Sequence, residues 1–248
     1  HISSGIAGLV GALMVGARRD KPENATNNAN SIPYAFLGAI LLFMGWLGFN
    51  AGSAGGVDDI AVNAFVVTIL SASTGFLVWI LAEWLIHKKP TVLGGLSGLV
   101  AGLVGITPAC GYVSIASSII IGAVAALLCY FGLSFIKYKL RLDDTLDAFS
   151  LHGIGGVWGG IATGLFASGA VNPAVVADGA LGEGLFIGGS WHLLLEQIFA
   201  IVLCITLSAV VSFVIFKLIS LFTSLRVEEE VEFEGLDKKI HGESAYSV

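Results

Sequence analysis

Two histidines are the side chains of this sequence best placed to do chemistry. His152 lies 11 residues after Arg141, the last basic residue before it, which is roughly 16 Å along a helix at about 1.5 Å per residue. His1 opens an apolar run that meets its first charge only at Arg18. If these runs cross a membrane, both histidines lie deep inside it, where ionisable groups are costly and usually functional. A dry site favours the neutral imidazole, which can both donate and accept a proton.

A stripe of side chains offers a possible wall for such a site. Leu42, Trp46, Phe49 and Ser53 fall at i, i+4, i+7 and i+11, which places them on one helix face. The stripe is apolar at its middle and polar at one end, and taken alone it favours a packing or lipid-facing surface over a pore wall. Asp147, five residues before His152, is expected to cap that helix, because a carboxylate near a helix N-terminus complements the dipole.

The composition indicates the kind of element that must position these residues. Of 248 residues, 56% are hydrophobic and only 12% are charged, against about a quarter in soluble domains. The sequence therefore predicts an all-α polytopic membrane protein with the lipid bilayer as its main solvent. Its basic residues form no clustered face, which argues against nucleic-acid binding. Cys110, Cys129 and Cys204 are expected to be buried small hydrophobes, with no disulfide, metal or cofactor.

Uncharged apolar stretches predict about seven membrane-spanning helices. They cover approximately residues 1–17, 33–54, 61–86, 92–106, 113–136, 146–167 and 192–222. The first is short for a span and starts abruptly, so we expect the chain to lack N-terminal helices. The last, roughly 45 Å long at about 1.5 Å per residue, must tilt or project past the bilayer. Glycines at every fourth position, at 94, 98 and 102 and at 156, 160 and 164, indicate close helix packing in lipid.

The basic residues alternate strictly between connections. All 12 lie at or beyond the ends of the first, third, fifth and seventh segments: Arg18, Arg19 and Lys21; Lys88 and Lys89; Lys137, Lys139 and Arg141; Lys217, Arg226, Lys238 and Lys239. Short basic loops stay on the cytoplasmic side. We therefore expect a transmembrane region over residues 1–223, in the cell membrane, and a cytoplasmic tail over residues 224–248.

Several strings resemble the ammonium transporter (Amt/Mep/Rh) family in its prokaryotic Amt form. They are HISSGIAGLVGALMVGAR at 1–18, GWLGFNAGSAG at 45–55, GLVAGLVGITPACGYV at 98–113, DAFSLHGIGGVWGG at 147–160 and the tail EGLDKKIHGESAYSV at 234–248. The resemblance implies an eleven-helix inverted-repeat channel that assembles as a homotrimer. This chain would be its C-terminal part: the end of the first half, the whole second half and the final helix.

The resemblance also implies roles for residues. His1 and His152 match a hydrogen-bonded pair of pore histidines, and Phe49 matches one of two rings that block the outer mouth. Ser53 matches a hydroxyl that contacts ammonium, while Trp46 and Leu42 match pore-wall positions. The implied substrate is ammonium or ammonia, with methylammonium as an analogue. The implied cytoplasmic partner is a trimeric P-II signalling protein.

Three other classes of protein compete with a transporter. A seven-helix retinal photoreceptor needs a lysine in mid-helix, but Lys217 lies only nine residues before Arg226, so snorkelling to the interface explains it better. An intramembrane metalloenzyme could use His1, His152 and Asp147, but no H-E-x-x-H spacing occurs. We therefore expect no enzyme. A sensor or gas channel on the same fold remains open.

Overall fold

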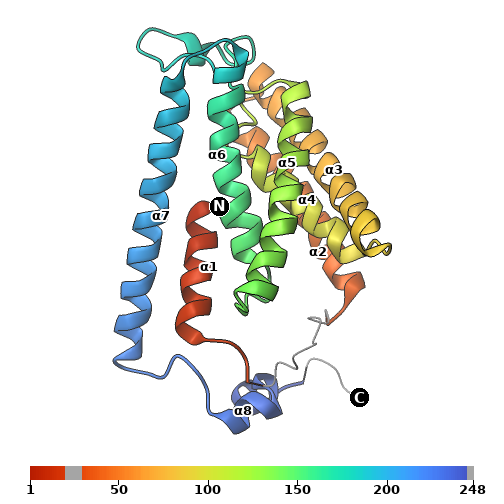
Figure 1. Ribbon diagram of the computed structural model, residues 1–248, viewed down its shortest axis with the longest axis vertical. Helices are drawn as coiled ribbons and strands as arrows, with labels where there is room; N and C mark the ends of the chain where they lie inside the picture. The colour runs from red at the N-terminus through yellow and green to blue at the C-terminus, as the bar shows by residue number, and fades with distance from the viewer. Residues whose placement is uncertain (20–29, 245–248) are drawn as a thin grey trace.

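The computed structural model describes residues 1–19 and 30–244, and every regular element within these residues is a helix (Figure 1). The α-helices are α1 (Ile2–Val15), α2 (Ile32–Gly52), α3 (Asp59–His87), α4 (Val92–Ile106), α5 (Ile115–Ser134), α6 (Gly155–Phe166), α7 (Trp191–Ser220) and α8 (Glu229–Glu234). π-Helical turns cover Phe135–Lys139, Phe149–Ile154 and Asp237–His241, and short 3₁₀ turns cover Pro173–Val176 and Leu185–Ile187. The predicted all-α fold class is confirmed.

The seven predicted spans correspond to seven apolar helical segments, but these differ in length. Four are long and apolar enough to cross a membrane: Ile32–Gly52, Asp59–His87, Ile115–Lys137 and Trp191–Ser220. Helices α1 and α4 are shorter apolar helices. The span predicted at 146–167 is a composite, because the π-helical turn Phe149–Ile154 runs directly into α6.

Most of the long helices begin at a side chain that caps them. Ser31, Asp58, Thr91, Ser114 and Ser190 each accept a hydrogen bond from a backbone amide two or three residues further on. Such a cap satisfies one of the amides left without a partner in the first helical turn. In an apolar chain these few polar residues therefore specify where these five helices start.

Glycine allows the central helices to touch backbone to backbone. A methyl group added at Gly98, in α4, would lie 2.5 Å from the carbonyl oxygen of Gly75 in α3. At the next turn, the Ser71 hydroxyl donates to the Gly102 carbonyl over 2.8 Å. Close approach of small residues replaces the hydrophobic force that is missing between helices in lipid. The glycine spacing of residues 94–102 therefore marks a real helix contact.

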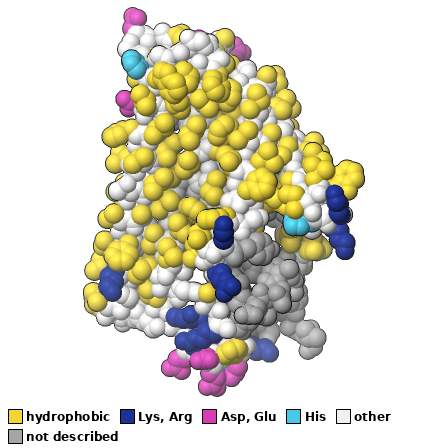
Figure 2. Space-filling view, viewed as in Figure 1, with side chains coloured by type: hydrophobic (Ala, Val, Ile, Leu, Met, Phe, Trp, Pro, Cys, Tyr) yellow, Lys and Arg dark blue, Asp and Glu magenta, His cyan; other side chains and the backbone are white. Residues whose placement is uncertain are grey.

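Lys and Arg side chains gather at the end of the molecule where α8 lies (Figure 2). The opposite end holds the loop that joins α6 to α7 (Figure 1). This arrangement agrees with the alternation of basic connections along the sequence. Lys21 and residues 245–248 of the expected tail lie outside the described residues.

Candidate functional site

The two histidines singled out in the sequence meet at mid-height of the helix bundle. Nδ1 of His1 lies 3.0 Å from Nδ1 of His152, and the ring centroids are 5.1 Å apart. His1 precedes α1, whose N-terminus lies between α6 and α7 in Figure 1, and His152 sits in the π-helical turn Phe149–Ile154. One Nδ1 must carry the hydrogen and the other must accept it. The pair can thus hold or pass a proton at a fixed distance.

The second ring nitrogen of His1 is free to bind a small molecule. Nε2 of His1 is buried and has no hydrogen-bond partner among the described residues. A buried polar atom without a partner costs about 1–3 kcal/mol, so such atoms usually have a function. Depending on the tautomer, Nε2 can donate to a small polar molecule or accept from it.

Trp46 fixes the plane of the His1 ring. The indole stacks on the imidazole with centroids 5.0 Å apart and an angle of 19° between the planes. Its Nε1 donates to Thr107 Oγ1 over 2.8 Å, and that hydroxyl donates to the Leu103 carbonyl over 2.7 Å. Phe49 meets Trp46 edge-on, with centroids 6.5 Å apart. These contacts place the rings in a row that ends at His152.

The stripe on α2 lines cavities on either side of Phe49. A cavity of about 540 Å³ is bounded by His1, Gly38, Leu41, Leu42, Gly45, Trp46 and Phe49. An adjoining cavity of about 390 Å³ includes Phe49, Asn50, Ser53, Thr107, Tyr112 and Asn172 in its lining. Phe49 lines both and is 61% exposed, as expected for a side chain that projects between two spaces. Ser53 is exposed, and its hydroxyl donates to the Phe49 carbonyl over 2.8 Å.

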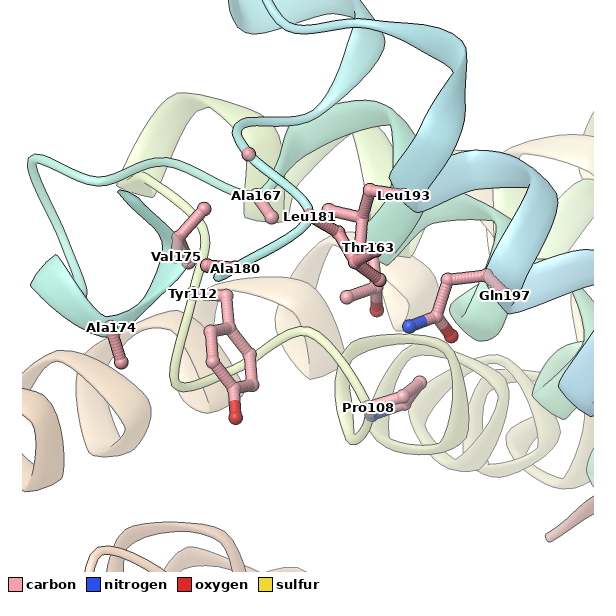
Figure 3. A pocket seen from close by; sticks show the side chains of 11 residues that line it. Pro108, Tyr112, Thr163, Ala167, Ala174, Val175, Ala180, Leu181, Leu193 and Gln197 are labelled. Atoms are coloured by element: carbon pink, nitrogen blue, oxygen red, sulfur yellow. The ribbon is translucent and has the colours of Figure 1, made fainter. Parts of the chain in front are cut away.

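Two further cavities are lined by residues of α6 and α7. One, of about 330 Å³, is lined by residues that include His1, Thr107, Pro108, Gln197 and Cys204. The other, of about 450 Å³, continues past Pro108 and Gln197 to Tyr112 and Thr163, between α6 and α7 (Figure 3). None of the side chains that line these two cavities belongs to Asp, Glu, Lys or Arg.

Sequence reasoning missed two polar pairs. Thr107 holds Trp46, and buried Asn50 donates through Nδ2 to Thr68 Oγ1 over 3.0 Å. Both involve polar residues inside or at the end of apolar runs, which is the signal that could have found them. A polar side chain at membrane depth needs a partner.

The expectation that Asp147 caps the helix of His152 is wrong. The carboxylate that accepts from the first amides, those of Ala148 and Phe149, belongs to Asp144. Asp147 adopts a left-handed backbone conformation (φ 57°), and its carboxylate pairs with Lys137 Nζ over 2.6 Å. Asp144 lies further upstream and can fold back over the helix start. Asp147 instead ties this helix to the turn after α5.

Metal chemistry finds no support in the described residues, because no cluster of three or more His, Cys, Asp or Glu side chains could hold an ion. Cys110 and Cys129 are buried, Cys204 is half-buried, and all three are free.

A charged network closes the end of the molecule near α8. Arg18 forms a two-pronged contact with Asp143, through Nε at 2.8 Å and Nη2 at 2.9 Å. Glu232 of α8 accepts from the Arg226 guanidinium at 2.7 and 2.9 Å and from the Arg19 backbone amide at 2.8 Å. The Arg226 and Arg19 hydrogen bonds lower the pKa of Glu232 to about 2. Described residues of the tail therefore contact the segment that follows α1.

Comparison with known proteins accounts for the whole chain. The model of the Ammonium Transporter Family matches residues 1–246. An ammonium transporter of Bacillus subtilis is 50% identical over 99% of this chain, which spans 58% of that relative. The crystal structure of Saccharomyces cerevisiae Mep2 superposes with a TM-score of 0.83 at 33% identity, covering 93% of this chain and 53% of Mep2. A solved sensor Amt protein gives a TM-score of 0.84 at 26% identity, covering 98% and 58%. From these matches and the helical architecture, the chain belongs to the Ammonium Transporter Family, a family of membrane transporters rather than enzymes.

Proposed function

We propose that this protein carries ammonium across the cell membrane through a pore that passes His1 and His152. The observation that supports this most directly is the 3.0 Å contact between the two imidazoles beside an apolar cavity. The Bacillus subtilis relative is an ammonium transporter, which supports the same substrate here. Polar groups held together at membrane depth usually mark a transport path.

The proposed mechanism separates ammonium from potassium by chemistry and not by size. Ammonium donates hydrogen bonds and can lose a proton, which potassium cannot do. Ser53 would accept hydrogen bonds from the cation at the outer end, and the faces of Phe49 and Trp46 would each attract it by ~0.5–2 kcal/mol. Beyond Phe49 the lining is apolar, and an unpaired ion there costs on the order of tens of kcal/mol in an idealised medium. The cation would therefore give its proton to the histidine pair behind Phe49, through the buried Nε2 of His1, and neutral ammonia would cross.

The histidine pair would also form hydrogen bonds with the neutral ammonia. Nε2 of His1 is buried without a partner, so a passing ammonia could complete its hydrogen bonding. The stack with Trp46 holds that ring in one orientation. The contact with His152 couples the tautomers of the two rings, so a proton that leaves one can be replaced from the other.

Replacement of His152 tests this proposal. In the full-length gene product, His152→Ala should lower methylammonium uptake by about tenfold or more, or admit potassium, since a lost polar partner in a dry site costs about 1–3 kcal/mol. The matched control is His192→Ala, which removes an exposed histidine at the start of α7. Uptake and potassium exclusion that match those of the control would refute the role of the pair.

A sensor is the second candidate function, because the solved sensor Amt protein shares this fold at 26% identity. A sensor binds ammonium without moving it at a useful rate. Uptake of methylammonium into cells supports the transporter, whereas binding to purified protein without uptake supports the sensor.

We also propose a cytoplasmic tail, a homotrimer and a P-II partner at the cytoplasmic face. The gathering of Lys and Arg near α8 supports the orientation, since basic segments stay in the cytoplasm (Figure 2). The mass of the detergent-solubilised protein tests the trimer. Co-purification with P-II protein, with and without residues 235–248, tests the partner; binding unaffected by the deletion would exclude the tail as its site.

A further inference from the structure

The helical segments that carry His1 and His152 cross each other, and glycine residues at the crossing allow their backbones to touch. Gly5 follows His1 by four residues, one helical turn, and so lies on the same face of α1. A methyl group added at Gly5 would overlap the backbone nitrogen of Gly153. It would also lie 2.5 Å from the Gly153 Cα and 3.0 Å from the carbonyl carbon of His152. The backbone of α1 therefore rests directly on the peptide that follows His152.

A second glycine, on the helix of His152, makes the matching contact with the start of α1. Gly156 follows His152 by four residues and faces the start of α1. A methyl group added there would lie 3.1 Å from the Cβ of His1 and 3.0 Å from Cγ1 of Ile2. Gly5 thus lies one turn from His1 and contacts the peptide that follows His152. Gly156 lies one turn from His152 and contacts His1. His152 and Gly153 belong to the π-helical turn Phe149–Ile154, and such turns are frequent at functional sites.

We infer that Gly5 and Gly156 are positioning residues for the histidine pair. Without side chains they set the separation of the two helices at which Nδ1 of His1 reaches Nδ1 of His152. That contact is 3.0 Å, and a polar contact of about 3.6 Å is no longer a hydrogen bond. A shift of well under 1 Å at this crossing therefore breaks the pair. The consequence for conduction rests on the proposed function of the histidines.

The same helix offers a matched control. A methyl group at Gly8 would meet only the Cβ of Ala148, at 3.4 Å, an ordinary packing distance. Gly5→Ala and Gly8→Ala make the same chemical change three residues apart, with the same effect on helix propensity. A difference in behaviour between the two variants therefore reflects the helix crossing beside the histidines.

The experiment compares Gly5→Ala, Gly156→Ala and Gly8→Ala in the full-length gene product. The first readout is the ¹⁵N signal of the histidine Nδ1 atoms by NMR, which changes when a hydrogen bond is lost; His152→Ala identifies the pair. We expect Gly5→Ala to remove the hydrogen-bond signature at a normal protein level and Gly8→Ala to keep it. The second readout is methylammonium uptake, which should fall about tenfold in Gly5→Ala and remain near wild type in Gly8→Ala.

The outcomes separate the two proposals. If Gly5→Ala keeps both the NMR signature and uptake at the level of Gly8→Ala, the positioning role is wrong. If the signature is lost and uptake is unchanged, the glycines position a pair that conduction does not use, and the proposed function fails. Should Gly5→Ala not accumulate, Gly156→Ala decides, because its contacts of 3.0–3.1 Å leave room for a folded protein. A retained signature there overturns the inference.

Discussion

The histidine pair and the charged end of the molecule both bring polar groups together, but in opposite surroundings. At the pair, two imidazoles meet beside an apolar cavity, and ring stacking and helix packing hold them. At the charged end, the partly buried Glu232 accepts hydrogen bonds from the Arg226 guanidinium and from the Arg19 backbone amide. The first contact should depend on packing and be insensitive to salt. The second depends on full charges, so salt and pH should weaken it.

The largest expected effect is on the packed side of this comparison. Trp46→Ala removes the stack on His1 and leaves Thr107 without its indole partner, in a core that also contains Leu99 and Leu103. We expect a loss of about 3–5 kcal/mol in the free energy of unfolding, as for other buried aromatic residues. Thermal unfolding in detergent at low and high salt measures it, and the loss should be the same at both.

Leu42→Ala provides the matched control, because Leu42 lines the same cavity from the same helix but is 56% exposed. It should cost much less than Trp46→Ala. An equal cost for the two would mean that the stack contributes nothing specific.

An intermediate effect is expected where the two regions meet. Asp147→Asn leaves Lys137 half-buried without a carboxylate, while asparagine still tolerates the left-handed backbone at φ 57°. We expect a loss of about 1–2 kcal/mol, smaller than for a fully buried pair. A double-mutant cycle with Lys137→Gln measures the coupling between the two residues. Additive losses would show that the ion pair does not stabilise the protein.

The smallest effect is expected at the exposed tail. The pKa of Glu232 lies below its ordinary value of 4.5, near 2, so its contribution to docking is complete above about pH 4.5 and is lost as the pH falls toward 2. Glu232→Gln should therefore free the tail at neutral pH, as followed by the mobility of a spin label at position 236. Lys239→Ala, at a mainly exposed ion pair with Glu234, should leave the label unchanged. Equal mobility in both variants would show that Glu232 does not dock the tail.

Hydropathy and charge predicted the helical segments well, because lipid imposes long apolar helices and basic loops on one side. The sequence also predicted that His1 and His152 lie deep in their apolar runs, and the start of α1 lies at mid-height of the bundle (Figure 1). The contact between the two histidines could not be predicted from spacing, since it joins residues 151 positions apart, and only the family resemblance implied it. The spacing of residues along one helix does not show which other helix crosses it.

Local geometry was the least predictable level. Asp144 and Asp147 are both plausible caps, and the choice between them depends on a left-handed residue and on where Lys137 lies. The π-helical turn at His152 has no simple sequence signal. The contact between Glu232 and the Arg19 backbone amide joins residues 213 positions apart, and no local sequence pattern signals it.

The length of α7 decides how the tail meets the membrane surface. Its 30 residues span roughly 45 Å at about 1.5 Å per residue, against a hydrocarbon layer of about 30 Å. An average tilt of about 20° shortens that span by only a few ångströms, so roughly 10 Å of α7 must stand outside the hydrocarbon layer. Residues 221–228, which are not helical, then join α7 to the acidic helix α8 and allow it to lie away from the lipid headgroups. Where the nearby leaflet is anionic, this distance reduces the repulsion that the acidic helix would meet at the surface.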